Sequence, residues 1–435
     1  MSKNVYIIGT GMTRFGKYLE KSVKDLTGEA LELVLRDCGL SRDTIEAAWF
    51  SNTFWGYYSS QHSIRGQVAL SAHGLDGIPI MNVENACASG STALHGAWTA
   101  IRAGLYDCVL AIGAEKLHDP DRAKVMMSFI SGTDIEVTTN AILRFQEEEK
   151  KRKEREAKRM GTEKVEEKPG GHSAAMDLYS VAARTHMKKY GMTQKQLAVI
   201  AAKAHNNSVF NPLAQYRFPM TMEEVLSDHE VSYPLTRAMC APIGDGAAAA
   251  VICSERFLKK KGANRAVRIR ASVLKSGRRM GEDEVFSLMI NPSGPPVSSV
   301  ENDICARTSR AAYEMAGIGP KDVDVAELHD ATAFGELYQT EQMGFCPIGE
   351  GGPFAESGAT SLGGSIPINP SGGLIARGHP LGASGLAQIY ELVMHLRGEA
   401  GKRQIEGTRI GLAENGGGVL GVGEASMAIH ILSTM

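Results

Sequence analysis

The sequence predicts an α/β protein built from two copies of one folding unit. Short runs rich in β-branched residues alternate with longer stretches of helical apolar periodicity, a pattern typical of a mostly parallel sheet covered by helices. The same order of elements recurs in the second part of the chain. At 435 residues the chain is long enough for two such units and a large core.

The elements of the first unit follow from local patterning. Strands are favoured where β-branched and aromatic residues cluster between turn signals, and helices where apolar residues recur at helical spacing. The segment 245–250 begins with Asp-Gly and continues as an alanine run, which predicts a turn entering a buried strand. The predicted elements before it are strands at 5–8, 47–53, 79–83 and 108–112 and helices at 23–38 and 88–103.

The second unit repeats this order with related sequences. A strand at 267–273 corresponds to the first strand, and a helix at 305–315 corresponds to the first helix. A single duplication explains all of these matches, whereas chance would have to supply each of them separately. The matching segments are 317–328 with 39–50, 383–385 with 88–90, and 411–414 with 112–115.

A long excursion separates the two units. Its segment 144–168 is dominated by Glu, Lys and Arg, and 147–156 contains no apolar residue. Opposite charges three and four apart favour a solvated helical arm, and a docking arm for a partner subunit is the alternative. Amphipathic helices are predicted again at 174–190 and 193–205. We divide the chain into an N-terminal half at 1–116 and 236–262, an inserted loop domain at 117–235, and a C-terminal half at 263–435.

Composition excludes several classes of function. Lys and Arg number 47 against 49 Asp and Glu, so no general field attracts nucleic acid or acidic lipid. The sequence shows no signal-peptide pattern and no apolar run of 18 residues, from which we expect a cytoplasmic protein without a membrane span. The seven cysteines lack CxxC spacing, which indicates reduced thiols and argues against disulfides or a zinc ribbon.

Cys87 has the sequence context of a nucleophile. It follows a predicted strand and precedes a helix that begins Ala-Ser-Gly-Ser-Thr. At such a junction free backbone N–H groups and the helix dipole favour the thiolate, and small neighbours leave room for a substrate. The alternative is a buried, inert thiol, which is the role expected for Cys38, Cys108 and Cys253.

Two histidines and a glycine-rich segment complete the candidate site. The Ala-Ser-Gly sequence that follows both Cys87 and His379 predicts that these two residues meet in one site. His379 lies between Gly and Pro in a stiff loop, from which it could deprotonate a thiol or donate to an oxyanion. His329 follows a predicted strand, where open α/β sheets place ligand-facing groups, although a structural role is also possible. The segment 414–418 is predicted to be a glycine-rich turn, whose backbone N–H groups could line a second anion pocket.

Five motifs, taken together, resemble the thiolase superfamily. In particular they resemble the branch of sterol-carrier-protein thiolases and archaeal acetoacetyl-CoA thiolases. The resemblance implies a five-layered αβαβα fold with two mixed sheets, a homodimer, and reversible Claisen chemistry on acyl-CoA. Coenzyme A is then a substrate, and no metal or covalently bound cofactor is expected. The motifs are Asn-Ala-Cys-Ala-Ser-Gly-Ser-Thr-Ala-Leu at 85–94, Gly-Asp-Gly-Ala-Ala-Ala at 244–249, Leu-His-Asp-Ala at 328–331, Asn-Pro-Ser-Gly-Gly at 369–373 and Gly-His-Pro-Leu-Gly-Ala-Ser-Gly at 378–385.

The resemblance assigns roles to the candidate residues. Cys87 corresponds to the acyl-accepting nucleophile, and His379 to the base that activates it and then binds the thioester oxygen. His329 stands where this branch has the histidine that supports the enolate oxygen. The backbone N–H of Cys87, with that of Gly416 or Gly417, would form the other oxyanion hole.

The chain departs from the family at the second catalytic cysteine. The two places where thiolases carry it read Ala331 and Glu414. Glu414 could replace the thiol if burial raises its pKa, His329 could do both jobs, and Cys346 is a remote third candidate. In the duplication Glu414 corresponds to Glu115, so a purely structural role for it is equally open.

The substrate and partners are open between alternatives. The chain resembles the thiolase subunit that cleaves benzoylsuccinyl-CoA in anaerobic toluene degradation in having Ala331, Glu414 and the charged arm. A short- or branched-chain acetyl-CoA acyltransferase is the alternative. Members of this branch often work with a small zinc-ribbon and OB-fold subunit, which would give a heterotetramer. Thiolase-like aldolases also pair with OB-fold partners but lack the nucleophile, so Cys87 argues against a lyase. A non-catalytic scaffold is a third class.

Overall fold

The computed structural model describes residues 4–141, 143–144, 147–148, 151, 174–262, 265–279, 281–290, 303–420 and 423–435. Within these residues one large sheet carries the fold, and a two-stranded sheet lies in the inserted segment. The strands of the large sheet are β1 (Val5–Met12), β2 (Ala47–Ser51), β3 (Ile80–Val83), β4 (Cys108–Glu115), β7 (Gly246–Ser254), β8 (Val267–Ser276), β9 (Val325–Glu327), β10 (Ile410–Leu420) and β11 (Gly423–Ser433), and those of the small sheet are β5 (Glu230–Ser232) and β6 (Leu235–Thr236).

The strand order displays the duplication. Among the described residues the large sheet has nine strands in the order β3-β2-β4-β7-β1-β8-β11-β10-β9. From the centre outward, β1, β7, β4 and β2 of the first half are mirrored by β8, β11, β10 and β9 of the second. The two half-sheets, expected as separate sheets, are joined because Val5–Ile7 pairs antiparallel with Val267–Ile269.

The sheet is mixed, so the expectation of a mostly parallel sheet was wrong. Strand β2 runs parallel to β3 and β4, and β9 runs parallel to β10. The other described neighbours are antiparallel, because β7 returns beside β4 after the long inserted segment and β11 returns beside β10 through a short hairpin. The mixed character expected from the family resemblance is confirmed.

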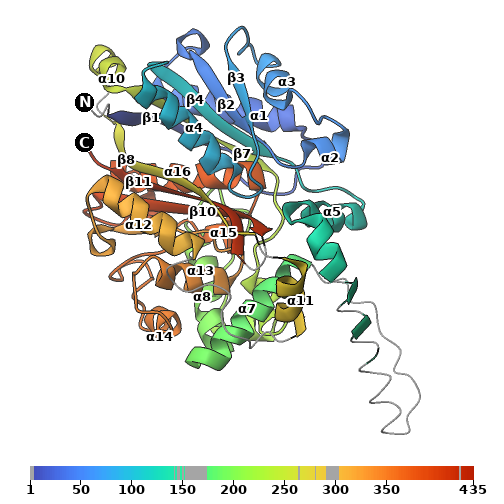
Figure 1. Cartoon of the computed structure of the whole chain (residues 1–435). Coiled ribbons are helices and arrows are strands. Elements are labelled where there is room, and N and C mark those ends of the chain that lie inside the picture. Colours follow the sequence, from blue (N-terminus) through green and yellow to red (C-terminus); the bar gives the residue numbers. More distant parts are fainter. Residues whose placement is uncertain are drawn as a thin grey trace, which may run out of the picture.

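Helices form three layers around the two half-sheets (Figure 1). Helix α1 (Val23–Cys38) packs on the outer face of the first half and α12 (Ile304–Ala316) on the outer face of the second. Helices α4 (Ser89–Ala103) and α16 (Leu381–Arg397) lie between the half-sheets in a shared apolar cluster. The five-layered αβαβα architecture is therefore confirmed.

Small residues allow the two central helices to approach closely. A Cβ built on Gly90 of α4 would lie 3.0 Å from the carbonyl oxygen of Gly382 in α16. A Cβ on Gly385 would lie 2.3 Å from Ser91 Oγ. Larger side chains at these positions would force the helices apart, so the repeated Ala-Ser-Gly sequence brings together the N-termini of α4 and α16.

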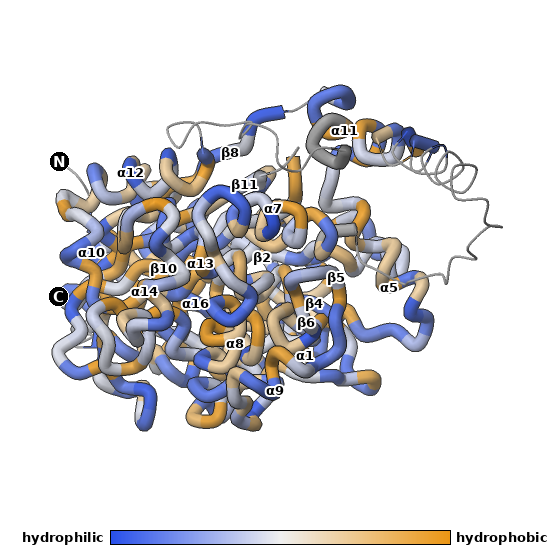
Figure 2. Tube along the Cα trace, turned by 90° about the horizontal axis from the view of Figure 1, so that it is seen from below, coloured by the Kyte–Doolittle hydropathy of each residue, from blue (hydrophilic) through white to orange (hydrophobic). Residues whose placement is uncertain are grey.

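The remaining helices cover the inserted segment and the connections. They are α2 (Trp55–Ser59), α3 (Arg65–Ser71), α5 (Arg122–Ser128), α7 (Ala174–Tyr190), α8 (Gln194–Ser208), α9 (Met222–Ser227), α10 (Glu255–Lys261), α11 (Glu282–Ile290), α13 (Ala333–Gln342), α14 (Gly351–Glu356) and α15 (Gly373–Arg377). Helices α7 and α8, which the sequence predicted, lie beside α13 of the C-terminal half (Figures 1 and 2). Leu197 and Ile200 of α8 share a buried cluster with Phe334 and Leu337 of α13.

The charged arm at 144–168 lies mostly outside the described residues. Of the described part, Lys151 pairs with Glu147 and Glu148 at 3.0 and 3.1 Å, the three- and four-residue spacing expected of an exposed helix. The boundaries of the three proposed domains stay predictions. Among the described residues, no helix has both the length and the apolar character needed to cross a membrane.

Candidate active site

The three principal site residues predicted from the sequence meet at one point. Cys87 Sγ and one ring nitrogen each of His329 and His379 lie within 4.8 Å of one another. The two imidazole rings are nearly perpendicular, with centroids 5.1 Å apart. Cys87 comes from the loop between β3 and α4, His329 from the loop after β9, and His379 from the loop before α16. Both halves of the chain thus contribute to one cluster.

The Cys87 turn has a sharply bent backbone. Ala86, directly before the cysteine, has φ 48°, a left-handed conformation that costs a non-glycine residue about 1–2 kcal/mol. The turn is closed by the bond from Ala88 N to Asn85 O at 3.0 Å, and Thr53 Oγ1 donates to Ala86 O at 3.2 Å. These bonds hold the cysteine at the N-terminus of α4, where small residues surround it.

Burial dominates the ionisation of Cys87. Removal of its sulfur from water raises the pKa of Cys87 to about 12, although the backbone N–H groups of Gly418 and Cys87 itself act in the opposite direction. The expectation that Cys87 rests as a thiolate was therefore wrong, because desolvation outweighs the helix N-terminus. The half-buried cysteine packs against a cluster of three buried side chains, Phe54, Leu117 and Leu381, which Tyr58, Phe129 and Ile243 also contact.

His379 is arranged to accept a proton. Its Nδ1 lies 2.8 Å from Ser384 Oγ, and that hydroxyl donates its own proton to Pro380 O at 3.0 Å. Ser384 must therefore accept from Nδ1–H, which leaves a lone pair on Nε2 with no hydrogen-bond partner among the described residues. Burial, together with the charges of His329 and Arg377, holds the pKa of His379 well below its usual range. The neutral ring thus presents a basic nitrogen.

His329 carries its ring proton on the opposite nitrogen from His379. The Asn415 amide nitrogen lies 3.0 Å from its Nδ1, so this nitrogen accepts and the ring proton sits on Nε2. Burial, assisted by the positive charge of Arg377, lowers the pKa of His329 to about 3. The neutral ring therefore offers an N–H donor.

Glu414 lies directly behind His329. Its Oε2 accepts from the backbone N–H of His329 at 2.8 Å, whereas Oε1 has no partner among the described residues. Burial above all holds the pKa of Glu414 well above its usual range. Its role as a proton carrier stays a prediction.

Glu115, the counterpart of Glu414 in the first half, has a saturated carboxylate. It accepts from Thr53 N at 2.9 Å and from Phe54 N, Gly382 N and Asn52 Nδ2 at 3.0 Å. Glu115 therefore ties loops together. Glu414 likewise accepts one backbone N–H, that of His329, from the loop that follows a neighbouring strand. The correspondence of the two glutamates stays a prediction.

The glycine segment is a strand and not the turn expected from the sequence. Gly416 and Gly417 belong to β10 and pair with Met427 and Ser426 of β11. A Cβ on Gly417 would lie 2.3 Å from Asn85 O, so this residue packs directly under the Cys87 turn. Among the three glycines, the backbone N–H that bonds to the Cys87 sulfur is that of Gly418. The predicted oxyanion roles of Gly416 and Gly417 stay predictions.

Sequence reasoning missed two residues that bear on the site, Arg377 and Ser384, and it gave the side chain of Asn415 no role. Arg377 is 1 % exposed and donates to Glu327 Oε2 at 2.9 Å, and its charge lowers the pKa of both histidines. Arg377 lies two residues before His379, and Ser384 lies in the motif of His379. Their closeness in sequence to predicted site residues could have pointed to them. The sequence does not show the direction of their hydrogen bonds.

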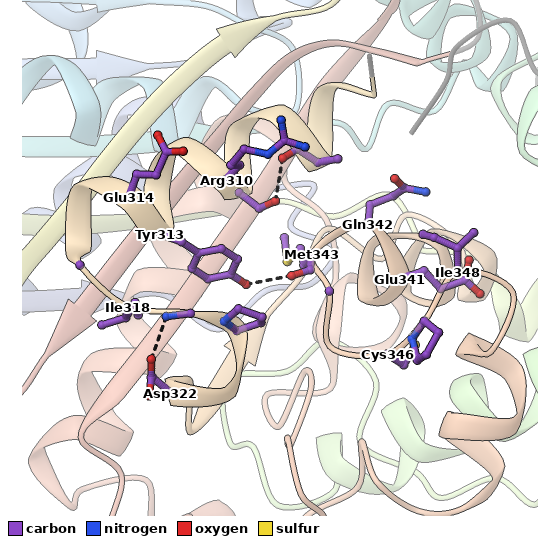
Figure 3. A pocket seen from close by; sticks show the side chains of 17 residues that line it. Arg310, Tyr313, Glu314, Ile318, Asp322, Glu341, Gln342, Met343, Cys346 and Ile348 are labelled. Carbon is purple, nitrogen blue, oxygen red and sulfur yellow. Dashed lines mark hydrogen bonds between the residues drawn. The ribbon is translucent and has the colours of Figure 1, made fainter. Parts of the chain in front are cut away.

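The other candidates for the second thiol position do not join the cluster. Ala331 follows His329 and its carbonyl oxygen accepts from Ala241 N at 3.0 Å. Cys346 lines a separate cavity of about 880 Å³ between α12 and the loop after α13, where Figure 3 shows it with Tyr313 and Gln342. That cavity does not include Cys87, His329 or His379 in its walls.

Two family models match most of the chain. The model described as "Thiolase, N-terminal domain" matches residues 5–230, and "Thiolase C-terminal domain-like" matches residues 298–434. Together they include every residue of the cluster. Cys87 falls within the first match, and His329 and His379 fall within the second.

Curated relatives match over nearly the whole chain. Sterol carrier protein 2 of Bos taurus is 36 % identical over 98 % of this chain and 71 % of its own length. Acetyl-CoA acetyltransferase of Methanothermobacter thermautotrophicus is 36 % identical over 99 % of this chain and 100 % of its own. Benzoylsuccinyl-CoA thiolase subunit BbsB of Thauera aromatica is 32 % identical over 93 % and 92 %.

A solved structure has a similar fold. A chain of the structure named "Ltp2-ChsH2(DUF35) aldolase" aligns with a TM-score of 0.73 over 99 % of this chain and 98 % of that chain. Its sequence identity is 20 %, so the similarity concerns the fold alone.

Proposed function

This chain belongs to the thiolase family and is an acyltransferase, and from this premise we propose that it cleaves a 3-oxoacyl-CoA with CoA through an acyl-Cys87 intermediate. The observation that carries the proposal is the meeting of Cys87 Sγ with ring nitrogens of His329 and His379 within 4.8 Å. A thiol beside a basic imidazole nitrogen is the arrangement that nucleophilic acyl transfer requires.

The first step is attack by Cys87 on the keto carbon. As the C–S bond forms, the thiol proton moves to the lone pair of His379 Nε2, and negative charge develops on the keto oxygen. Backbone N–H groups of Cys87 and Gly418, which face the sulfur, would hold that oxygen. The resting site is neutral, so the charge appears only as the substrate reacts.

The second step breaks the bond between the α and β carbons. The electron pair passes to the thioester enolate. Its oxygen would accept hydrogen bonds from His329 Nε2–H and from the protonated His379. A further acid must then protonate the enolate carbon. A second CoA thiol attacks the acyl-cysteine, and His379 returns its proton to the departing Cys87 sulfur.

The acyl group is proposed to be aromatic or branched, as in benzoylsuccinyl-CoA of anaerobic toluene degradation. Support comes from three aromatic rings in the apolar cluster against which Cys87 packs: Phe54 contacts Tyr58 and Phe129 edge-to-face, with centroids 6.4 and 5.6 Å away. Similarity to the benzoylsuccinyl-CoA thiolase subunit points in the same direction. A short-chain acetyl-CoA acetyltransferase is the second candidate, supported by the Methanothermobacter relative.

The assembly is part of the same proposal. Strand β3 is one of the two edge strands of the large sheet and its residues are not fully buried, which suits pairing with a second copy in a homodimer. A small zinc-ribbon and OB-fold subunit would complete a heterotetramer, and the name of the similar aldolase structure likewise includes a second, DUF35 protein. We propose a cytoplasmic location, without nucleic-acid or membrane partners.

The test is to trap the acyl group. The full chain, alone and with its neighbouring operon products, is incubated with acetoacetyl-CoA and with benzoylsuccinyl-CoA, quenched in acid and analysed by peptide mass spectrometry. We expect the acyl mass on the Cys87 peptide, no adduct in Cys87→Ser, and an unchanged adduct in Cys38→Ser, a matched control because Cys38 is also a half-buried free thiol.

The alternatives predict other results. Absence of a covalent adduct, together with cleavage of a 3-hydroxyacyl-CoA, would favour the aldolase. Absence of any reaction, with iodoacetamide spread evenly over the seven cysteines, would favour a non-catalytic scaffold.

A further inference from the structure

The proposed cleavage leaves one proton without a donor. His379 Nε2 holds the proton taken from Cys87 and must return it to the sulfur, while His329 Nε2–H supports the enolate oxygen. The enolate carbon therefore needs a separate acid whose pKa lies near the working pH. Ala331 carries no ionisable group. The acid must therefore come from another part of the fold.

Glu424 lies on β11, the strand that pairs with the glycine segment under Cys87. Its side chain folds over Gly416, since a Cβ built on Gly416 would lie 2.8 Å from Glu424 Cγ and 3.3 Å from its Oε1. The carboxyl group thus fills the space into which a side chain at position 416 would project. Two residues beyond Gly416 on β10, the N–H of Gly418 bonds to the Cys87 sulfur.

Besides β10, three helices contribute residues near the Glu424 carboxyl group. The Gln339 side chain of α13 hydrogen-bonds to it, and Asp303 at the N-cap of α12 adds negative charge. Burial first and Asp303 second raise the pKa of Glu424 to about 7. Burial first, and then the charges of Glu424, Cys87 and Glu414, hold the pKa of Tyr179 on α7 well above its usual range, so Tyr179 lies near both the Glu424 carboxyl group and the nucleophile.

We infer that Glu424 is the acid/base that exchanges a proton with the α-carbon of the acyl-CoA, an inference that rests on the proposed thiolase reaction. Glu424 is half-buried and its carboxyl borders the space over Gly416. Glu414, the candidate named from the sequence, is fully buried and bonded to the His329 backbone. Glu424 therefore suits proton exchange with a ligand, and Glu414 suits support of His329.

With Glu424 in this role, every proton transferred in the reaction has a donor and an acceptor. In the first half-reaction the Cys87 proton goes to His379 and the Glu424 proton goes to the enolate carbon, which releases the shortened thioester. In the second, Glu424 carboxylate takes the proton of the incoming CoA thiol as that sulfur attacks the acyl carbon. His379 then returns its proton to Cys87, so both residues regain their starting states.

The experiment compares Glu424→Gln with Glu414→Gln in the full chain. Three quantities are measured: kcat for thiolysis across pH, exchange of solvent deuterium into the α-carbon, and the rate at which iodoacetamide alkylates Cys87. Loss of a general acid typically costs about 10²–10⁴-fold. We therefore expect that loss in kcat and in exchange for Glu424→Gln, with Cys87 alkylation unchanged within about twofold.

The pH profile separates catalysis from structure. Cleavage needs the protonated carboxyl, so wild-type kcat should fall as the pH rises above about 7, where Glu424 ionises. This limb should vanish in Glu424→Gln, persist in Glu414→Gln even if the rate is lower, and return with partial activity in Glu424→Asp. The alkaline fall in kcat reports the ionisation of one group. Replacing a residue that has only a structural role would not remove this fall.

Each failure has its own signature. Wild-type protein that forms acyl-Cys87, combined with Glu424→Gln that keeps kcat within about threefold or keeps the alkaline limb, would overturn the inference alone. Wild-type protein without any acyl-Cys87 would overturn the proposed reaction and the inference with it. Loss of Cys87 alkylation in Glu424→Gln would show a disturbed site and would also count against it.

Discussion

Replacing Ser384 by alanine tests whether the tautomer of His379 drives nucleophile activation. In the folded chain Ser384 Oγ accepts from His379 Nδ1 at 2.8 Å, and both side chains are buried. In the variant Nδ1–H loses its acceptor. The effect should grow as the ring takes up the Cys87 proton, because an imidazolium is then left facing an empty position.

The magnitude follows from the charge on the donor. A hydrogen bond to a charged group is worth about 1.5–3 kcal/mol. At about 1.4 kcal/mol for each factor of ten, kcat/KM for a 3-oxoacyl-CoA should fall about 10- to 150-fold in Ser384→Ala. Alkylation of Cys87 by iodoacetamide should slow in parallel, since it needs the same proton transfer from sulfur to Nε2.

A matched control separates this effect from helix stability. Ser309 of α12 is also a buried helix serine, and its hydroxyl donates to Ala306 O at 3.1 Å without contacting a histidine. Ser309→Ala should lower the free energy of unfolding without slowing Cys87 alkylation. If Ser384→Ala alkylates Cys87 as fast as the wild type, Ser384 does not set the basic nitrogen and the tautomer argument is refuted.

Two further predictions concern the anion pocket and the core. Gly418→Ala should reduce kcat on the order of 10²-fold, which is the typical cost of losing one oxyanion donor. Gly418 has φ 66°, so a Cβ there would displace its N–H. A wild-type kcat in this variant would exclude Gly418 N–H as an oxyanion donor. Arg403→Met should destabilise the fold by about 3–5 kcal/mol at pH 7, because the buried Glu391 keeps His395 but loses Arg403, whose Nε and Nη2 donate to its two oxygens at 2.7 and 2.9 Å. Burial raises the pKa of Glu391, but His395 and then Arg403 lower it to about 2 from 4.5, so the stabilisation is present above pH 4.5 and is lost toward pH 2. The difference between the wild-type and Arg403→Met urea unfolding curves should accordingly shrink from pH 7 to pH 3, and a constant difference would contradict the assignment.

The sequence predicted the parts of the fold that depend on local pattern and on repetition. The helix at 23–38 was placed correctly because Ser22 and Asp25 form a capping box and Gly39 ends the helix with φ 63°. The convergence of Cys87 and His379 was predicted from the repeated Ala-Ser-Gly sequence. The structure supplies the reason, which is the close approach of α4 and α16 at Gly90 and Gly385.

Features that depend on distant segments escaped prediction. The direction of β7 beside β4 follows from the path of the inserted segment, for which local periodicity gives no information. Glycine is common in turns, so the glycine run predicts a turn, whereas Gly417 lies in a strand and packs closely against the Cys87 turn. Glu424 has no motif around it; it pairs with Val419, and only the folded structure brings its side chain back over Gly416.

The resting state of the catalytic pair follows from burial in a way that no local pattern reveals. The helix N-terminus before α4 favours a thiolate, but Phe54, Leu117 and Leu381, which are distant in sequence, remove water from the sulfur. Burial raises the pKa of Cys87 and lowers the pKa of His379, so both shifts favour the neutral thiol and the neutral imidazole. An ion pair would form only when a substrate carbonyl accepts the charge at the N–H groups of Cys87 and Gly418. The nucleophile is thus produced in the attacking step itself, which protects an otherwise reactive cysteine between turnovers.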